Sequence, residues 1–277
     1  ILPAWATVRD RTLRGMIGSH TARLGEWYTR RLKNEFEREH FVRAEAKDMK
    51  LGLAVDAEAV LMNDFGRFKP EIKEVWRGDQ FTVAQEGDIP VSEKEPTWTA
   101  FGVDSGFLGG RFDLVLWDDL YDPRKMRTAD AREDLKRWWD EVAETRLEPG
   151  GLLILQGQRM ASDDIYRYAL DKVAPVDDDV EIEDVNDGKV DLEGERKYTH
   201  LKFKAHYDER CEQLHKPSDV AYPEGCLLYP RRLPWRRIRH VKAQTPDRYE
   251  ILYQQEDTDP ASVLVDPLWI SGGTGNN

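Results

Sequence analysis

Hydrophobic and polar positions form their clearest pattern at residues 112–119, a short apolar run that ends in two acidic residues. Short runs with β-branched and aromatic residues are typical of buried strands in a parallel sheet. Asp118 and Asp119 follow at the carboxyl end of this strand, where open α/β sheets bind their ligands. In a nucleotide-hydrolysing site, Asp118 would hold Mg²⁺ and Asp119 would polarise the attacking water. The same pattern also arises where two acids simply begin a surface loop.

Apolar residues at helical spacing predict an amphipathic helix over residues 22–36. Its apolar face is predicted to contain Leu24, Trp27, Tyr28 and Leu32. Its other face carries Arg23, Arg30, Arg31 and Lys33. Those cations either form a solvated surface or include one that reaches a phosphate bound by a neighbouring subunit.

A second helix is predicted over residues 128–146, with Asp130 to Glu133 resembling a capping box. Trp138 and Trp139 within it are interpreted as core residues rather than as a platform for stacking bases. The apolar run 152–156 follows and is predicted to be a second buried strand. This strand–helix–strand order predicts a parallel pair.

Further strands are predicted at 72–83, as a pair joined by a turn at Gly78 and Asp79, and at 97–103 and 198–206. The sequence therefore indicates an α/β protein with a mostly parallel sheet flanked by helices. Residues 176–197 are acidic and rich in Asp and Gly, which predicts a solvated insertion.

Two polar residues, Gln158 and Arg159, follow the strand at 152–156. At the tip of a strand next to Asp118 and Asp119, they are suited to sense a γ-phosphate. A plain polar loop explains them equally well.

Composition narrows the possible partners. The 277 residues carry a formal net charge of −12 and are 40% hydrophobic, so any nucleic acid would have to contact a local basic patch. Cys211 and Cys226 form neither a CxxC pair nor a zinc-ligand pattern. No apolar stretch approaches the roughly 18 residues of a membrane span. We therefore expect a soluble intracellular protein that does not engage a membrane.

The most concentrated basic stretch is residues 230–242. Its arginines are Arg231, Arg232, Arg236, Arg237 and Arg239. Arginines so grouped are candidates for contact with DNA phosphates. They are equally suited to a helix surface that pairs with the surplus acids of the chain.

Several motifs, in order, resemble those of the large terminase subunit of tailed bacteriophages, the motor that pumps DNA into the capsid. Gly110-Arg111-Phe-Asp-Leu-Val-Leu-Trp-Asp-Asp119 is similar to the Walker B region of that family. Thr145-Arg146-Leu147-Glu-Pro-Gly-Gly151 is similar to its Thr-Arg-Leu-x-Pro-Gly-Gly motif. The segment 156–165 resembles its coupling segment, with Gln158 in place of a threonine and Met160 in place of a tryptophan. Residues 252–255 with Trp269 resemble the junction between motor and nuclease, and residues 17–21 resemble a strand and loop early in the motor.

The resemblance implies a RecA-like P-loop NTPase fold of the ASCE class, with ATP and Mg²⁺ as cofactors. It implies that Asp118 coordinates Mg²⁺, that Asp119 is the catalytic carboxylate, and that Gln158 and Arg159 contact or sense the nucleotide. The implied partners are double-stranded DNA, the portal protein, the small terminase subunit and further copies in a ring. The implied location is the host cytoplasm, transiently at the procapsid portal.

The sequence contains no Gly-x-x-x-x-Gly-Lys-Ser/Thr motif. By the resemblance, that phosphate-binding loop would lie ahead of Ile1, and most of the nuclease domain would follow Asn277. We therefore expect residues 1–250 to be the later part of an ATPase domain that is incomplete at its N-terminus, and residues 251–277 to be a linker and the start of the nuclease. We expect the isolated chain to hydrolyse ATP poorly or not at all.

Two other functions fit the sequence. One is a metal-dependent DNA endonuclease using Asp104, Asp113, Asp118 and Asp119 with two Mg²⁺ ions. Strand alternation disfavours it, because Asp113 and Asp118 should point to opposite faces of their strand. The other is a non-catalytic module that docks to a portal or to the rest of a split motor.

Overall fold

The structure, a computed structural model, describes residues 1–39, 60–71, 75–85, 96–105, 109–122, 124–161, 163–173, 197–207 and 226–256. The chain divides into two compact units. The first comprises Ile1–Asp122 with Glu133–Gly157, and the second comprises Pro123–Arg132 with Gln158–Asn277. Most of the predicted acidic insertion and everything after residue 256, including the predicted nuclease start, lie outside the described residues.

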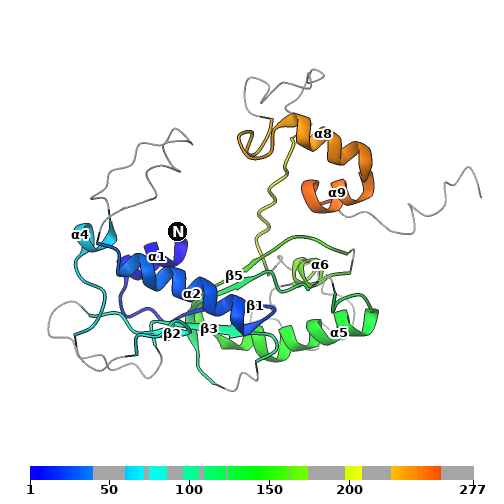
Figure 1. The fold of residues 1–277 in the computed structure, drawn as a ribbon. Coiled ribbons are helices and arrows are strands. Elements are labelled where there is room, and N and C mark those ends of the chain that lie inside the picture. Colours follow the sequence, from blue (N-terminus) through cyan, green and yellow to red (C-terminus); the bar gives the residue numbers. More distant parts are fainter. Residues whose placement is uncertain are drawn as a thin grey trace, which may run out of the picture. The chain divides into compact units, whose positions relative to one another are not determined.

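The helices and strands are shown in Figure 1. They are α1 (Leu2–Arg9), β1 (Gly15–Ser19), α2 (Ala22–Phe36), α4 (Leu61–Phe65), β2 (Gln80–Phe81), β3 (Trp98–Gly102), β4 (Phe112–Asp118), α5 (Ala129–Trp138), β5 (Leu147–Gln156), α6 (Ile165–Leu170), α8 (Trp235–Gln244) and α9 (Pro246–Gln254). In the described part of the chain, no helix is long and apolar enough to cross a membrane.

The first unit is an α/β fold built on a mixed, mostly parallel sheet. Among the described strands the order is β2-β3-β1-β4-β5, and only β2 runs antiparallel to its neighbour. The predicted strand at 112–119 is confirmed as β4, which lies between β1 and β5 and is parallel to both. Helices pack on both faces of this sheet, as expected for parallel strands.

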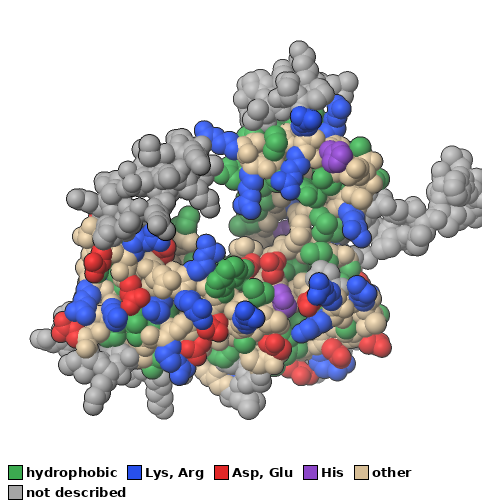
Figure 2. Space-filling model, viewed as in Figure 1, with side chains coloured by type: hydrophobic (Ala, Val, Ile, Leu, Met, Phe, Trp, Pro, Cys, Tyr) green, Lys and Arg blue, Asp and Glu red, His purple; other side chains and the backbone are tan. Residues whose placement is uncertain are grey.

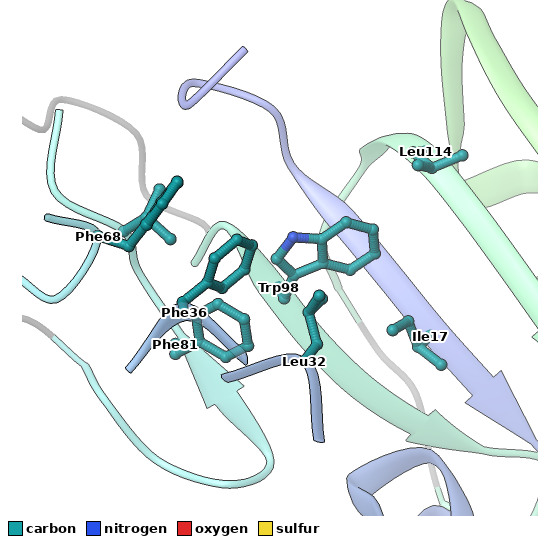
Figure 3. Packing of buried hydrophobic residues seen from close by; sticks show 8 residues of the cluster. Ile17, Leu32, Phe36, Phe68, Phe81, Trp98 and Leu114 are labelled. Atoms are coloured by element: carbon teal, nitrogen blue, oxygen red, sulfur yellow. The ribbon is translucent and has the colours of Figure 1, made fainter. Parts of the chain in front are cut away.

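Helix α2 covers one face, and its bounds match the predicted helix. Leu32 and Phe36 pack in a cluster with Ile17, Trp98 and Leu114 from three strands, as Figure 3 shows. Trp27 was predicted to face this core, but 57% of its surface is exposed. The buried positions of α2 are Gly25, Thr29, Leu32 and Phe36, which places Trp27 outside this face. Gly25 lies against the sheet because small residues allow the helix backbone to approach it closely.

The opposite face of the sheet contacts the helix after β4. Trp117 of β4 and Trp138 of α5 meet edge to face with ring centroids 5.1 Å apart, and Trp139 is fully buried. This confirms the core role predicted for the two tryptophans. The helical path continues from α5 through a π-helical turn, Trp139–Ala143, and a 3-10 turn, Glu144–Arg146. The predicted capping box is wrong, because the Thr128 hydroxyl, and not Asp130, accepts the hydrogen bond from the Ala131 amide.

Two β1 glycines make room for large rings from the neighbouring strands. A Cβ at Gly15 would lie 2.5 Å from the Trp98 ring, and one at Gly18 would lie closer still to the Trp117 ring. Both indoles are at most 1% exposed and cannot swing into solvent. The paired tryptophan–glycine contacts therefore set the packing of β1 between β3 and β4.

Three other strand predictions differ from the structure. The pair expected at 72–83 is reduced to β2 and an isolated bridge between Trp76 and Phe81. Strand β5 was predicted to be buried, yet Leu152 is 54% exposed, because β5 has only one partner among the described strands. The strand predicted at 198–206 is wrong, since its only β pairing in the described part of the chain is the bridge from His206 to Leu227. Its alternation does not correspond to burial of the apolar side chains, because Leu201 is 74% exposed and Phe203 is 62% exposed.

In the second unit, α8 and α9 pack around a small apolar core of Ala205, Cys226, Leu227, Ile238 and Tyr249. The buried Gln254 side chain holds the extended segment before Tyr207 to α9. Its Oε1 accepts from the His206 amide at 3.1 Å, and its Nε2 donates to the His206 carbonyl at 2.7 Å. This side chain thus makes the pair of backbone hydrogen bonds that a neighbouring strand would make. The segment is therefore held in place without a β ladder.

Candidate functional site

The candidate site lies at the carboxyl ends of three adjacent parallel strands. Asp118 ends β4 opposite Gln156, which ends β5, and β1 ends at Ser19 on the other side of β4. This is the edge at which open α/β sheets bind ligands. The sheet order therefore brings together polar residues that are about 100 positions apart in the chain.

Asp118 is half-buried and lines a cavity of about 610 Å³ in the first unit. The cavity walls are mostly apolar side chains from α1, α2 and α4, including Trp5, Leu32 and Phe65. Polar groups enter it from Tyr28, Arg31, Glu35 and Gln156. A carboxylate among the lining residues of a largely apolar cavity is a typical arrangement of a ligand site.

The Tyr28 hydroxyl forms a hydrogen bond with the Asp118 carboxylate. Burial raises the pKa of Asp118, the Tyr28 hydrogen bond opposes that rise, and the neighbouring Asp119 charge adds to it. Burial and the negative charge of Asp118 together raise the pKa of Tyr28 to about 12. Tyr28 therefore stays protonated at neutral pH and donates a hydrogen bond to the Asp118 carboxylate.

Asp119 has an unusual backbone conformation that several hydrogen bonds hold in place. Its φ is 48°, in the left-handed region that non-glycine residues seldom adopt. Its carbonyl accepts from His20 Nδ1 at 3.0 Å and more weakly from the His20 amide and the Ser19 hydroxyl, both at 3.4 Å. Its amide donates to the Gln156 carbonyl at 3.1 Å. Backbone strain held in this way is found mostly at functional sites.

The Asp119 side chain is exposed and makes no hydrogen bond or ion pair in the described part of the chain. Because the Asp119 carbonyl can only accept a hydrogen bond, His20 must carry a proton on Nδ1 to donate to it. The carboxylate of Asp119 is thus free to act on a ligand, while its backbone is fixed.

Sequence reasoning missed His20 and Tyr28 as site residues. Tyr28 was placed among the core residues of its helix, and His20 was noted only within a loop motif. The only sequence signal for His20 was its place in residues 17–21, which resemble a strand and the loop that follows it. No sequence signal indicated that the polar end of Tyr28 would reach Asp118.

Gln158 and Arg159 belong to the second unit, and there they hold the loop after β5 to the end of α9. Gln158 Nε2 donates to the Leu252 carbonyl at 2.7 Å, and the Arg159 amide donates to Gln255 Oε1 at 3.2 Å. Two segments that carried the family resemblance are therefore in direct contact. The side chains predicted to contact nucleotide have protein partners in this conformation.

Asp164 organises the same loop. This carboxylate is fully buried and accepts from Arg159 Nε at 2.9 and 3.1 Å. It also accepts from the amides of Met160, Ala161 and Arg167 at 2.9 to 3.2 Å. The last of these bonds makes Asp164 the N-cap of α6.

Two acids of the alternative nuclease site have structural partners. Asp113 accepts from the Arg14 amide and guanidinium at 2.8 to 3.2 Å, and Asp104 accepts from the Ala22 amide at the start of α2 at 3.0 Å. Burial alone would raise the pKa of Asp113, but the bonds from Arg14 lower it overall. Asp113 does not line the Asp118 cavity. Among the described residues, no three His, Cys, Asp or Glu side chains are grouped to hold a metal ion.

This geometry fits Mg²⁺ bound with a substrate phosphate better than a metal held by protein alone. Mg²⁺ commonly takes one or two carboxylates, several waters and phosphate oxygens. Asp118 and Asp119 provide that number of carboxylates at one strand end. The four acids predicted for a two-metal nuclease do not come together.

The five predicted DNA-binding arginines are exposed in the second unit. Arg231 and Arg232 precede α8, and Arg236, Arg237 and Arg239 lie on it.

The chain was compared with models of protein families and with curated proteins, and none of them matches it.

Proposed function

We propose that this chain is part of a Mg²⁺-dependent ATPase, the large terminase subunit of a tailed bacteriophage, which drives double-stranded DNA into the capsid. The observation that carries the proposal is the pair Asp118 and Asp119 at the end of the central parallel strand. One carboxylate is half-buried and hydrogen-bonded, and the other is exposed on a fixed, strained backbone. Two acids in such different environments suit two different roles.

In this proposal Asp118 and Asp119 have separate tasks. Asp118 holds the metal, and the Tyr28 hydroxyl orients its carboxylate in the way that outer hydrogen bonds orient metal ligands. Bound Mg²⁺ would neutralise phosphate charge. Asp119 orients the attacking water and accepts its proton, and the bonds from His20 and Ser19 hold it in register.

The finer fold assignment is also a proposal. The parallel strands with acids at the end of β4 support a RecA-like ASCE fold, with Gln158 and Arg159 in the coupling segment. The bonds from these residues to α9 support a coupling role, because they join the loop after β5 to a distant helix. The portal protein, the small terminase subunit, a ring of copies and a site of action in the host cytoplasm belong to the same proposal.

Binding of Mn²⁺ in the presence of ATP, followed by electron paramagnetic resonance, tests the metal site. Asp118→Asn should weaken Mn²⁺ binding by more than about 10-fold. Asp134→Asn, an exposed acid on α5, is the matched control and should bind as the wild type does. Wild-type levels of binding by Asp118→Asn would refute the assignment. No binding by the wild-type chain would instead favour the non-catalytic docking module.

Hydrolysis is the second test. The chain contains no phosphate-binding loop motif, so turnover is expected only when a polypeptide with that motif is supplied or joined. In that protein Asp119→Asn should lower the rate by about 10²- to 10⁴-fold with little loss of Mn²⁺ binding. Equal loss of both readouts would refute the separate roles of the two acids.

A further inference from the structure

Helix α8 has one buried apolar side and one exposed basic side. Ile238 is fully buried and packs with Cys226, Leu227 and Tyr249, and Trp235 and Val241 pack against the same cluster. The side chains on the other side are exposed, as Figure 2 shows for the cations of this helix. We define the α8 basic face as Arg232, Arg236, Arg237 and Arg239.

The structure separates the two interpretations that the sequence left open for these arginines. Pairing with the chain's own acids would require ion pairs, yet the four side chains make neither an ion pair nor a hydrogen bond in the described part of the chain. Lys242 differs, since it lies 4.0 Å from Glu250 and over the Tyr249 ring. From Gly225 through Pro246 the sequence has no acidic residue, although the chain has 53.

The position of these charges on the helix is unfavourable for stability. Arg236 and Arg237 lie in the first turn of α8, which has no acidic residue and no side-chain cap. The amino end of a helix carries a partial positive charge, so cations there cost roughly 0.3–1 kcal/mol each. A surface that only needed to be solvated would gain from acids at this position. The arrangement instead suits an anionic partner.

The chemistry of the face indicates what that partner is. All four of its cations are arginines, whose planar guanidinium groups bind phosphate oxygens with two hydrogen bonds. A membrane is disfavoured, because the apolar side of α8 is buried in its own core and cannot enter a bilayer. The ten residues of α8 span roughly 15 Å, a length over which duplex DNA presents several phosphates.

We propose that the α8 basic face binds the phosphate backbone of duplex DNA without reading its sequence. This inference names a contact surface for the nucleic acid of the proposed motor. It rests on the charge and exposure of side chains in the second unit, and its test requires no ATP.

The test is binding of the chain to a fluorescent DNA duplex at several salt concentrations, measured by polarisation without nucleotide. One variant changes Arg232, Arg236, Arg237 and Arg239 to serine. The control variant changes four other arginines to serine, each paired with a surface acid in the first unit: Arg30, Arg67, Arg77 and Arg137. Both variants lose the same charge, so any difference reports the location of that charge.

The salt dependence gives the expected magnitude. Each phosphate contact contributes about −0.9 to the slope of log K against log salt, so removing four should reduce the slope by about 3–4. Affinity near 0.1 M salt should fall by at least about 100-fold in the α8 variant. The control should keep most of the slope. Duplexes of unrelated sequence should bind alike.

Four results would overturn the proposal. The first is no binding of the duplex by the wild-type chain. The second is an unchanged slope of log K against log salt in the α8 variant. The third is a loss of affinity in the control variant as large as that in the α8 variant. Competition by polyglutamate as strong as by DNA would assign the face to an acidic protein, and would also overturn it. Loss of Mn²⁺–ATP binding in Asp118→Asn with intact DNA binding would support this surface and the metal site independently.

Discussion

Gly25 lets α2 approach the sheet, and replacing it with alanine should destabilise the first unit. A Cβ at this position would lie 2.5 Å from the Phe101 carbonyl oxygen, 3.1 Å from the Ile17 oxygen and 3.2 Å from the Phe101 amide nitrogen. All three atoms belong to strand backbones, which cannot rotate away as a side chain could. The helix would have to move off the sheet.

Two opposing effects decide the sign. In a helix interior, alanine is more favourable than glycine by about 0.8–1.0 kcal/mol. Overpacking of a core costs about 1–3 kcal/mol, and a contact at 2.5 Å with backbone belongs at the upper end. We therefore expect a net loss of about 1–2 kcal/mol. Because Tyr28 lies one turn further along α2, the shift should also loosen its bond to Asp118.

Hydrogen exchange of the β1 and α2 amides measures this locally. Gly25→Ala should exchange about 5- to 30-fold faster than the wild type. Asn34→Ala, at an exposed position of the same helix, is the control and should exchange equally fast or more slowly, because alanine has the higher helix propensity. Equal or greater protection in Gly25→Ala would refute the close-approach argument.

Three further predictions concern single polar side chains. Hydrogen bonds from Trp76, Lys33 and Lys69 outweigh burial and lower the pKa of Glu37 from 4.5 to about 2, so Glu37→Gln should reduce the free energy of unfolding at neutral pH by about 1–3 kcal/mol. That stabilisation should be complete above pH 4.5 and lost as pH falls toward 2. Urea unfolding at several pH values measures it, and an identical pH dependence of the unfolding free energy in Glu37→Gln would contradict it. Asp164→Ala should cost about 3 kcal/mol, since it strips a buried arginine and three amides of their acceptor, and exchange should rise around α6; a change below 1 kcal/mol would refute this role. His20→Ala should lower ATP turnover in the loop-supplied protein while leaving Mn²⁺ binding at Asp118 intact, and an unchanged rate would remove His20 from the site.

Local patterns were sufficient for much of the fold. The spacing in residues 22–36 gave α2 with its bounds, the apolar run gave β4, and the strand–helix–strand order gave the parallel β4–β5 pair. These features depend on periodicity within a few turns or one strand. The core position predicted for Trp27 and the strand predicted at 198–206 were wrong, because neither pattern shows which packing partner is present.

The sequence by itself determined the two acids at the end of a strand, the α/β class and the cluster of arginines. Those features are local in the chain, and strand and helix periodicity makes them readable. Only the tertiary structure showed that Tyr28 bonds to Asp118 and that His20 bonds to the Asp119 carbonyl. It also showed that Gln158 bonds to the Leu252 carbonyl, 94 residues away. It also decided that the arginines of the α8 basic face are exposed and make no ion pair in the described part of the chain. Such contacts depend on how distant segments pack, and no spacing along one chain specifies that.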